Sequence, residues 1–375
     1  MIKGLYHHRT QATDAQGIHI NEMYNAFGRL GISMKMVALV ENEAVGQDAR
    51  DNLWGKITSS LPSICYEIME MAYNLVGVFK LYRASVGEQP LFIYERYSIY
   101  NIAGCIVSKL TKIPLIEEVN APLAFEKKKY GNLHFPKLAQ AVETWIINHS
   151  FKTIAVTHVL KEILVKNGAN IEKIVVMPNG VNFQDHPVSL PRRLDQKIVL
   201  GFVGWFRDWH GLNELVEIYA RHGWDKKKVH LLLIGDGPAR KMIEQTIDQH
   251  NLQKHVTITG AVGRQQLQIY LEKVDIALQP AVTEYASPMK LIEYMVNGKA
   301  IVAPDQPNIK ELLTHKLNAI LFKPGDWEDF ALQIEKLVAN PSLVHQIGVG
   351  ARNTVKEKSL SWDYNAKQVV RLITL

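Results

Sequence analysis

Short runs of apolar residues recur along the chain, and longer segments with helical periodicity separate them. The runs are rich in Val, Ile and Leu and are continuous rather than alternating, which is typical of strands buried on both faces by crossover helices. They cover residues 5–6, 34–40, 91–94, 113–119, 153–157 and 174–178, and then 198–204, 229–235, 256–260, 275–279, 300–304 and 319–322. The pattern predicts an α/β protein with two doubly wound, Rossmann-like parallel sheets.

A polar segment with two prolines separates the two sets of runs. It reads NGVNFQDHPVSLPRRLDQK over residues 179–197 and has no strong periodicity, which is typical of an interdomain linker. We place an N-terminal domain at 1–182, the linker at 183–197 and a C-terminal domain at 198–350. The amphipathic pattern over 351–375 predicts a terminal helix that crosses back to the first domain. Because ligands of open α/β sheets lie outside the carboxyl ends of the strands, we expect the two domains to face a ligand cleft.

Composition and charge exclude several classes of protein. The chain has 375 residues, of which 47% are hydrophobic and 21% charged, an ordinary balance for a globular protein. The net charge of +6 is spread thinly, and no basic stripe suits a nucleic-acid backbone. One dense basic run, Lys127 to Lys129, has aromatic neighbours. The run suits an anionic lipid surface, and a solvated charged face is the alternative.

The cysteines and the N-terminus indicate a cytoplasmic protein. Cys65 and Cys105 lie in apolar periodic surroundings, so we expect buried free thiols rather than a disulfide. The N-terminus reaches two histidines before the apolar region of a signal peptide could form, and no apolar run approaches the length of a membrane span. The expected location is the cytoplasm, with peripheral attachment to the inner face of the membrane as an extension.

Candidate ligand-binding residues follow the strands. After the first strand, Gly17 would let a ligand approach the backbone closely, just ahead of a helix whose free N–H groups suit an anion. The alternative is a turn glycine with His19 as a packed or surface side chain. After the run 198–204, Arg207 and His210 would place two cations beside a helix start, as a diphosphate pocket requires. A surface arginine and a capping histidine are the alternative there.

The segment EYASPMKLIEYM, residues 284–295, predicts an anion-binding helix start. Ser287 suits the N-cap and Pro288 the first helical position, so that the next two backbone N–H groups would point toward phosphate oxygens. Glu293 follows Lys290 by three residues, and its carboxylate suits the vicinal hydroxyls of a ribose. A capped helix with a solvated glutamate is the alternative, but it leaves Glu293 unexplained inside an otherwise apolar pattern.

Taken in order, these segments resemble a known family. FVGWFRDWHG and YASPMKLIEYMVNGKAIVAP, together with MPNGVN, LLLIGDGP, VTITGAV and the N-terminal glycine loop, are similar to nucleotide-sugar glycosyltransferases of family four. The resemblance implies the GT-B fold and transfer of a sugar from a nucleoside-diphosphate sugar to an acceptor hydroxyl, with retention of configuration. It also suggests a role in surface polysaccharide or glycolipid synthesis. No D-x-D pair occurs in a loop, so neither a metal nor a cofactor besides the donor substrate is expected.

Two departures from the family pattern affect the assignment of residues. The family usually has two glutamates eight positions apart, but the position eight before Glu293 holds Tyr285, and Glu284 is one position away. The family also has a basic pair in the loop after the run 198–204, where this chain has Trp205 and His210. Glu293 is therefore the glutamate that carries over, and Arg207 and His210 together would supply the charge.

For the acceptor, the resemblance points to the residues after the fourth strand, where Asn120 and Glu118 could also be strand-end caps. The expected catalytic residues are Arg207, His210, Glu293 and Asn120; the donor-binding residues are Gly17, Gly204, Val262, Tyr285, Ser287, Pro288, Met289, Lys290 and Glu293; the acceptor-side residues are His19, Glu118 and Asn120.

Two other functions stay open at this stage. A nucleotide-sugar epimerase of the same fold would need clustered carboxylates, and the sequence shows no such cluster. A catalytically silent nucleotide-sugar-binding subunit fits the missing first glutamate. The expected partners are a nucleoside-diphosphate sugar, a saccharide or lipid-linked saccharide, and an anionic membrane surface, without nucleic acid. The sequence does not specify the base, the sugar or the acceptor.

Overall fold

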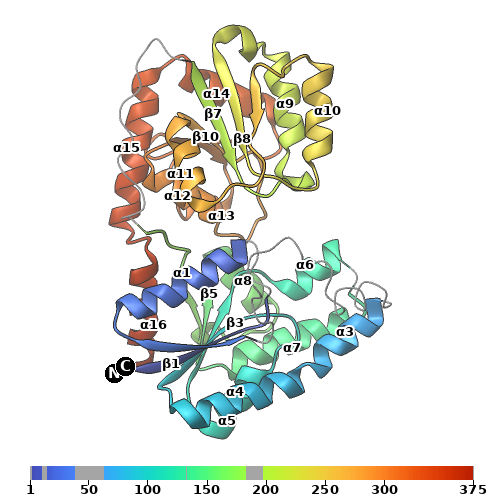
Figure 1. The fold of residues 1–375 in the computed structure, drawn as a ribbon, viewed down its shortest axis with the longest axis vertical. Helices are drawn as coiled ribbons and strands as arrows, with labels where there is room; N and C mark the ends of the chain where they lie inside the picture. Colours follow the sequence, from blue (N-terminus) through green and yellow to red (C-terminus); the bar gives the residue numbers. More distant parts are fainter. Residues whose placement is uncertain (1, 11–14, 39–62, 132, 183–196, 375) are drawn as a thin grey trace. The chain divides into compact units, whose positions relative to one another are not determined.

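The computed structural model describes residues 2–10, 15–38, 63–131, 133–182 and 197–374. The chain forms two compact units: unit 1 comprises residues 1–178 and 362–375, and unit 2 comprises residues 179–361. Each unit has one six-stranded sheet with helices packed on it (Figure 1). Each of the twelve predicted apolar runs overlaps a strand, and the prediction of two Rossmann-like parallel sheets is confirmed. The predicted linker, apart from Lys197, lies outside the described residues.

Unit 1 holds the first six strands, in the order β2-β1-β3-β4-β5-β6, with every neighbouring pair parallel. Every residue of β3 and β4 is buried, as expected for central strands covered on both faces. The strands are β1 (Lys3–His8), β2 (Ser33–Ala38), β3 (Phe92–Arg96), β4 (Leu115–Val119), β5 (Lys152–Ala155) and β6 (Ile174–Val176), and the helices are α1 (Ala15–Arg29), α3 (Ser63–Ala72), α4 (Asn74–Glu88), α5 (Ala103–Thr111), α6 (Leu123–Tyr130), α7 (Pro136–His149), α8 (His158–Lys166) and α16 (Trp362–Thr374).

The terminal helix α16 belongs to unit 1 and lies beside α1 (Figure 1). Arg29 of α1 and Asp363 of α16 form an ion pair at 2.6 Å. The return to the first unit begins at residue 362 rather than at 351, because α15 (Pro341–Glu357) still belongs to unit 2. The first boundary likewise follows Pro178 and not residue 182.

Unit 2 holds the other six strands, in the order β12-β11-β10-β7-β8-β9. Alternate residues of β7 enter two apolar layers: Leu200 and Phe202 pack on the side of α9 and α14, whereas Val199 and Val203 pack on the side of α12. The strands are β7 (Ile198–Val203), β8 (Val229–Ile234), β9 (Val256–Ile258), β10 (Ile276–Leu278), β11 (Ala300–Pro304) and β12 (Ile320–Phe322), and the helices besides α15 are α9 (Leu212–Arg221), α10 (Arg240–Gln249), α11 (Arg264–Lys273), α12 (Met289–Val296), α13 (Pro307–Lys310) and α14 (Trp327–Val338).

The two cysteines lie in different environments. Cys105 of α5 is buried, as predicted. Cys65 of α3 is exposed, so the prediction of burial is wrong there. Its apolar neighbours Ile64, Tyr66 and Ile68 are exposed as well, which means that the apolar pattern of α3 does not mark a buried face.

Across the described ranges, no helix combines the length and the apolar character that a membrane span requires.

Candidate functional site

The side chain of Lys290 is the centre of a polar site in unit 2. Its Nζ atom is buried and has no hydrogen-bond acceptor among the described residues. The ammonium lies over the ring of Phe202, 4.1 Å from the ring centroid. Burial lowers the pKa of Lys290 to about 7, and the nearby charge of Glu293 opposes this shift. A buried ammonium with no acceptor is costly for the fold, and an anion bound beside it would offset that cost.

Gly204 makes room for this ammonium at the end of β7. Its φ of +147° is rarely adopted by other residues, and a Cβ atom there would lie 2.8 Å from Nζ of Lys290. The next strand supports the same loop, because the Gly204 N–H donates to Ile234 O at 3.0 Å. A Cβ atom on Gly235 would lie only 2.0 Å from Gly204 O. The glycines after β7 and β8 therefore let two backbone segments approach each other closely, and Gly204 also lies against Lys290.

The helix α12 begins one residue later than the sequence predicted. Pro288, not Ser287, is the N-cap, and no side chain caps the helix. The Ser287 hydroxyl instead accepts a hydrogen bond from the Asn179 N–H at 3.3 Å, and Asn179 Nδ2 donates to Ser287 O at 2.7 Å. The prediction of a serine cap is therefore wrong, because the hydroxyl is used to hold the start of unit 2. The first N–H groups of α12, at Met289 and Lys290, still have no acceptor within the helix.

Two further contacts fix α12 in place. The amide of Asn308 is buried and donates to Thr283 O at 3.0 Å and to Ala286 O at 2.8 Å, which holds the loop ahead of the helix. The N–H of Val203 donates to the Tyr294 hydroxyl at 2.8 Å, which joins the end of β7 to the helix. The site is thus built on restrained backbone rather than on a free loop.

Glu293 is half-buried on α12, between the buried residues Ile292 and Tyr294. Eight positions earlier, the side chain of Tyr285 is buried, whereas Glu284 is exposed. Val262 is partly buried and packs against the apolar layer that contains α12. Of the predicted donor residues in unit 2, Met289 and Lys290 therefore begin α12, Gly204 lies against Lys290 and Glu293 lies further along the helix, while Val262 packs against its apolar layer.

Arg207 and His210 lie in the loop after β7, but only Arg207 is a cation. The exposed guanidinium of Arg207 lies 5.3 Å from the centroid of the Trp209 ring. Burial lowers the pKa of His210 to about 3, and the charges of Lys290 and Arg207 act in the same direction. The prediction of a second cation at position 210 is therefore wrong: the ring is neutral, and its Nδ1 accepts a hydrogen bond from the backbone N–H of Arg207 at 3.4 Å.

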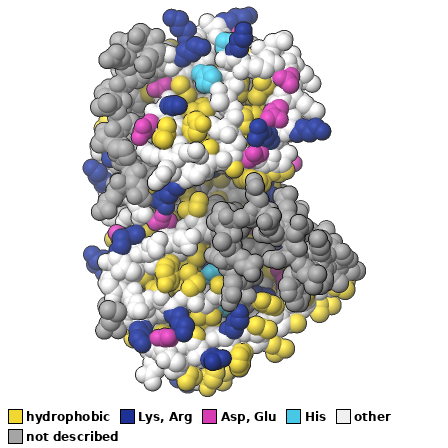
Figure 2. All heavy atoms as spheres, viewed as in Figure 1, with side chains coloured by type: hydrophobic (Ala, Val, Ile, Leu, Met, Phe, Trp, Pro, Cys, Tyr) yellow, Lys and Arg dark blue, Asp and Glu magenta, His cyan; other side chains and the backbone are white. Residues whose placement is uncertain are grey.

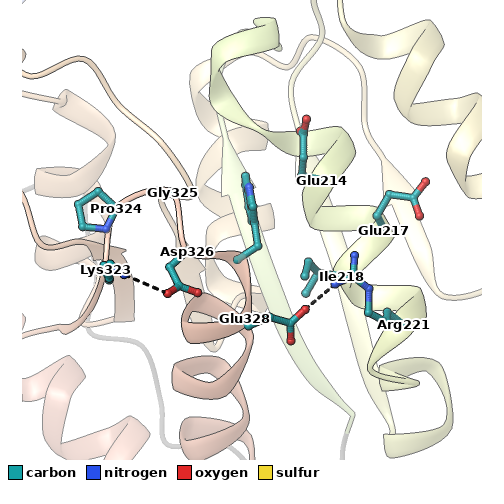
Figure 3. Close-up of a pocket in the computed structure, with 10 residues that line it drawn as sticks. Glu214, Glu217, Ile218, Arg221, Lys323, Pro324, Gly325, Asp326 and Glu328 are labelled. Carbon is teal, nitrogen blue, oxygen red and sulfur yellow. Dashed lines mark hydrogen bonds and ion pairs between the residues drawn. The ribbon is translucent and has the colours of Figure 1, made fainter.

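A separate pocket of about 550 Å³ opens elsewhere in unit 2 (Figure 3). It lies between α9 and the segment that leads into α14, and none of the predicted donor residues lines it. Charged side chains pair with one another there, Arg221 with Glu328 at 2.5 Å and Lys323 with Asp326 at 3.7 Å. Trp327 is among its lining residues. Its indole also lies close to Gly211, where a Cβ atom would be only 2.5 Å from the ring. The pocket therefore backs the loop that carries His210.

In unit 1, Glu118 joins several predicted acceptor-side residues in one buried network. Its carboxylate accepts hydrogen bonds from Tyr94 OH at 2.7 Å and Arg96 at 3.1 Å, and from the amide of Asn120. His19 Nε2 lies 3.1 Å from the same carboxylate. Burial alone would raise the pKa of Glu118, but His19 and Arg96 outweigh it and lower the pKa. Glu118 is therefore an ionised carboxylate surrounded by donors.

His19 contacts both partners of this ion pair. Its Nδ1 lies 3.1 Å from Nη1 of Arg96, and its Nε2 faces the Glu118 carboxylate. The ring also packs edge-on against Trp362 of α16, with centroids 4.6 Å apart. His19 is therefore a buried part of the network.

Gly17 lies in the first turn of α1 and is buried. The sequence placed it in a loop ahead of the helix, and this prediction is wrong. The apolar periodicity of the helix becomes visible only from Ile20 onward, so that the pattern did not mark the first turn.

The structure also reveals carboxylates that sequence analysis missed. His7, Glu95, Glu117 and Thr153 are paired in register across β1, β3, β4 and β5 and are all fully buried. Glu95 contacts His7, and burial followed by the charge of Glu95 raises the pKa of Glu117 well above its usual value. In the sequence, the two adjacent glutamates Glu117 and Glu118 inside a predicted buried strand were the signal that could have indicated these buried carboxylates. Because the row lies under α5, with Gly104 against Glu95, it is a core feature and not an open acid–base site.

Comparisons with known proteins agree with this architecture. A family model for glycosyl transferases group 1 matches residues 184–354, and a model for glycosyltransferase family 4 matches residues 16–185. An uncharacterised glycosyltransferase of Methanocaldococcus jannaschii is 24% identical over 74% of this chain and 76% of its own length. A 2-deoxystreptamine N-acetyl-D-glucosaminyltransferase of Niallia circulans is 26% identical over 69% of each chain.

A solved structure shows the same fold. The crystal structure of the Anabaena protein HepE in complex with UDP superposes with a TM-score of 0.74 over the full length of both chains, at 15% identity. Since the two family models lie end to end over residues 16–354 and the fold is that of the GT-B enzymes, this chain belongs to the glycosyltransferases of family four, group 1, and is a glycosyltransferase.

Proposed function

We propose that this glycosyltransferase uses a nucleoside-diphosphate sugar and binds its diphosphate at the start of α12. The observation that carries the proposal is the buried Nζ atom of Lys290, which has no acceptor among the described residues. A diphosphate oxygen would supply that acceptor and form a charge-assisted hydrogen bond. The structural neighbour HepE binds UDP and UDP-glucose, which supports a donor of this class.

The residues around Lys290 take complementary roles. The backbone N–H groups of Met289 and Lys290 donate to phosphate oxygens along the helix axis, and the guanidinium of Arg207 adds a second charge from the loop after β7. Glu293 accepts hydrogen bonds from the ribose hydroxyls. His210 contributes a neutral ring that shapes the loop. As the bond from the sugar to the diphosphate breaks, negative charge grows on the leaving group, and these fixed donors stabilise it.

On the acceptor side, we assign contact with the sugar or acceptor to Asn120. Its amide is oriented by Glu118, whose oxygens already receive hydrogen bonds from Tyr94, Arg96 and Asn120. A carboxylate held in this way orients its neighbours rather than abstracting a proton. The transfer proceeds with retention of configuration. It needs no metal ion, because protein groups neutralise the diphosphate.

The proposed acceptor is a saccharide or lipid-linked saccharide of a surface polysaccharide or glycolipid, reached at an anionic membrane. The basic run of α6 supports this assignment in part. Lys127 is paired with Glu70 at 3.3 Å, whereas Lys128 and Lys129 are exposed. Binding to anionic vesicles that is weaker for Lys128→Ser/Lys129→Ser than for the unmodified protein is the expected result. Equal binding would remove the run from the docking surface.

The donor class is tested by thermal shift against nucleotides and nucleotide sugars, followed by incubation with labelled donors. A ligand present at about 100 times its Kd stabilises the fold by about 2.7 kcal/mol. We expect a nucleoside diphosphate and one of its sugars to raise the Tm, and that sugar to be transferred or hydrolysed. A new sugar epimer, or binding without any turnover, would contradict the proposal.

A further inference from the structure

A strip of exposed apolar side chains runs along α4. Leu75, Phe79, Tyr82 and Val86 lie four, three and four residues apart, which places them on one face of the helix. Their exposed fractions are 79%, 65%, 45% and 58%. At the rise of an α-helix the strip is about 17 Å long. The opposite face, with Leu81, is buried in unit 1, so α4 is apolar both inward and outward.

The neighbouring helix α3 widens this apolar surface. Ile64, Tyr66 and Ile68 are exposed on it. Hydrophobic side chains gather along the lower right edge of the view in Figure 2, where α3 and α4 lie in Figure 1. Single exposed apolar residues are normal on soluble proteins, but a contiguous group of this kind marks an interaction surface. We call the exposed side chains of α3 and α4 the apolar face of unit 1.

The charges on α4 are basic. Lys80 and Arg83 are its only charged residues ahead of Glu88 at the C-terminal end. Glu88 is occupied by Lys3 at 3.3 Å and Lys35 at 3.1 Å, so its charge is balanced locally. An apolar strip flanked by unbalanced basic residues is the composition of a helix that lies in the headgroup region of an anionic membrane.

We propose that the apolar face of unit 1 docks on an anionic lipid surface, with Leu75 and Phe79 among the acyl chains and with Lys80 and Arg83 against the phosphates. A second copy of the chain is a poorer occupant. A twofold contact through α4 would oppose the same basic side chains, with no acidic residue of the strip to balance them. The docking surface is independent of the donor site, because α3 and α4 belong to unit 1 and Lys290 to unit 2.

The test is co-sedimentation of the full chain with vesicles of pure phosphatidylcholine and of equal parts phosphatidylcholine and phosphatidylglycerol. Leu75→Gln/Phe79→Gln removes the apolar contact. Ile269→Gln/Leu332→Gln is the matched control, because these two side chains are 55% and 50% exposed in unit 2. Lys80→Gln/Arg83→Gln removes only the charges. All four side chains of the two apolar pairs are exposed, so their replacement leaves the core intact.

We expect the unmodified protein to prefer the anionic vesicles. The α4 apolar variant should bind about tenfold more weakly, as expected when two large apolar side chains no longer enter the interface, while the control binds unchanged. The charge variant should show a smaller preference and a smaller sensitivity to salt, and the remainder should come from Lys128 and Lys129 of α6. Equal binding by the two apolar variants would overturn the proposal. So would a dimer in sedimentation velocity that the α4 variant dissociates while no protein binds vesicles. Donor hydrolysis without vesicles reports on the donor site alone and should not differ between variants.

Discussion

The ammonium of Lys290 lies 4.1 Å from the centroid of the Phe202 ring. The contact joins the first helical turn of α12 to the central strand β7, and it replaces the hydrogen bonds that a lysine normally makes with water. Because this replacement is incomplete, burial lowers the pKa of Lys290 to about 7. Burial of this side chain therefore costs stability, and a bound anion would offset that cost.

Binding of a diphosphate should therefore take up a proton. Above pH 7 much of Lys290 is neutral in the free protein, and a bound anion raises its pKa again. Calorimetric titration with UDP at about pH 8, in buffers of different ionisation enthalpy, measures this uptake. We expect Lys290→Met to abolish it. Lys299→Met is the control, since burial also lowers the pKa of Lys299, to about 8, but its Nζ donates to Glu272 O. Equal uptake by Lys290→Met and the unmodified protein would contradict the assignment.

Gly211 should couple the pocket residue Trp327 to the loop that carries His210. Gly211 has a φ of +66°, and a Cβ atom there would lie 2.5 Å from the indole. Gly223 has a similar φ of +59° but open space around it. Gly223→Ala should therefore cost about 1 kcal/mol of stability through the backbone alone, and Gly211→Ala should cost more and also weaken UDP binding. Denaturant unfolding and titration measure both, and identical behaviour of the two variants would refute the coupling.

Glu117 and Glu118 should respond oppositely to substitution, although they are adjacent. The raised pKa of Glu117 means that its stabilising effect is full below the unfolded pKa and is lost as the pH rises through the folded value. The unmodified protein should therefore lose stability as the pH rises from acidic to neutral, and Glu117→Gln should not show this loss. Glu118 has a lowered pKa, so its contribution is present at neutral pH and lost on acidification. Glu118→Gln should cost about 3 kcal/mol at pH 7.

Denaturant unfolding at several pH values separates the two glutamates. Equal destabilisation by Glu117→Gln and Glu118→Gln at neutral pH would contradict the charge states assigned to them.

Turnover should survive a chelator. In the proposed donor site, Lys290, Arg207 and the start of α12 neutralise the leaving diphosphate, so we expect no divalent cation to be required for that role. Activity with the transferred sugar is measured with and without excess EDTA. Loss of activity that magnesium or manganese restores would show that a metal, and not these residues, carries the charge.

The sequence predicted the strands well because each buried strand is a continuous apolar run, as at 198–204 and 300–304. It placed Gly204 and Lys290 after the runs that form β7 and β10, and these two strands are direct neighbours in the sheet. The sequence could not predict the charge states of the site residues. The neutrality of His210 results from burial and from Lys290, which is eighty positions away in the chain, and no local pattern reports such a contact.

Other features escaped prediction for similar reasons. The Ser287 hydroxyl accepts a hydrogen bond from Asn179, which is far from Ser287 in the sequence, so the local pattern did not predict this role. The row that includes Glu95 and Glu117 exists only through the register of β3 on β4. The apolar strip of α4 looks like an ordinary core face in sequence, and only the packing shows that Leu75 and Phe79 point away from the core.

The assignment of Glu293 to the ribose is tested most directly by the affinities of UDP and 2′-deoxy-UDP for two variants. Glu293→Gln loses charge-assisted hydrogen bonds worth about 1.5–3 kcal/mol, or roughly tenfold or more in affinity. Glu284→Gln is the control, since Glu284 is exposed one position from the place of the absent glutamate. We predict that the unmodified protein and Glu284→Gln prefer UDP over 2′-deoxy-UDP, and that Glu293→Gln loses this preference with an unchanged Tm. An undiminished preference in Glu293→Gln would contradict the placement of the nucleotide at α12.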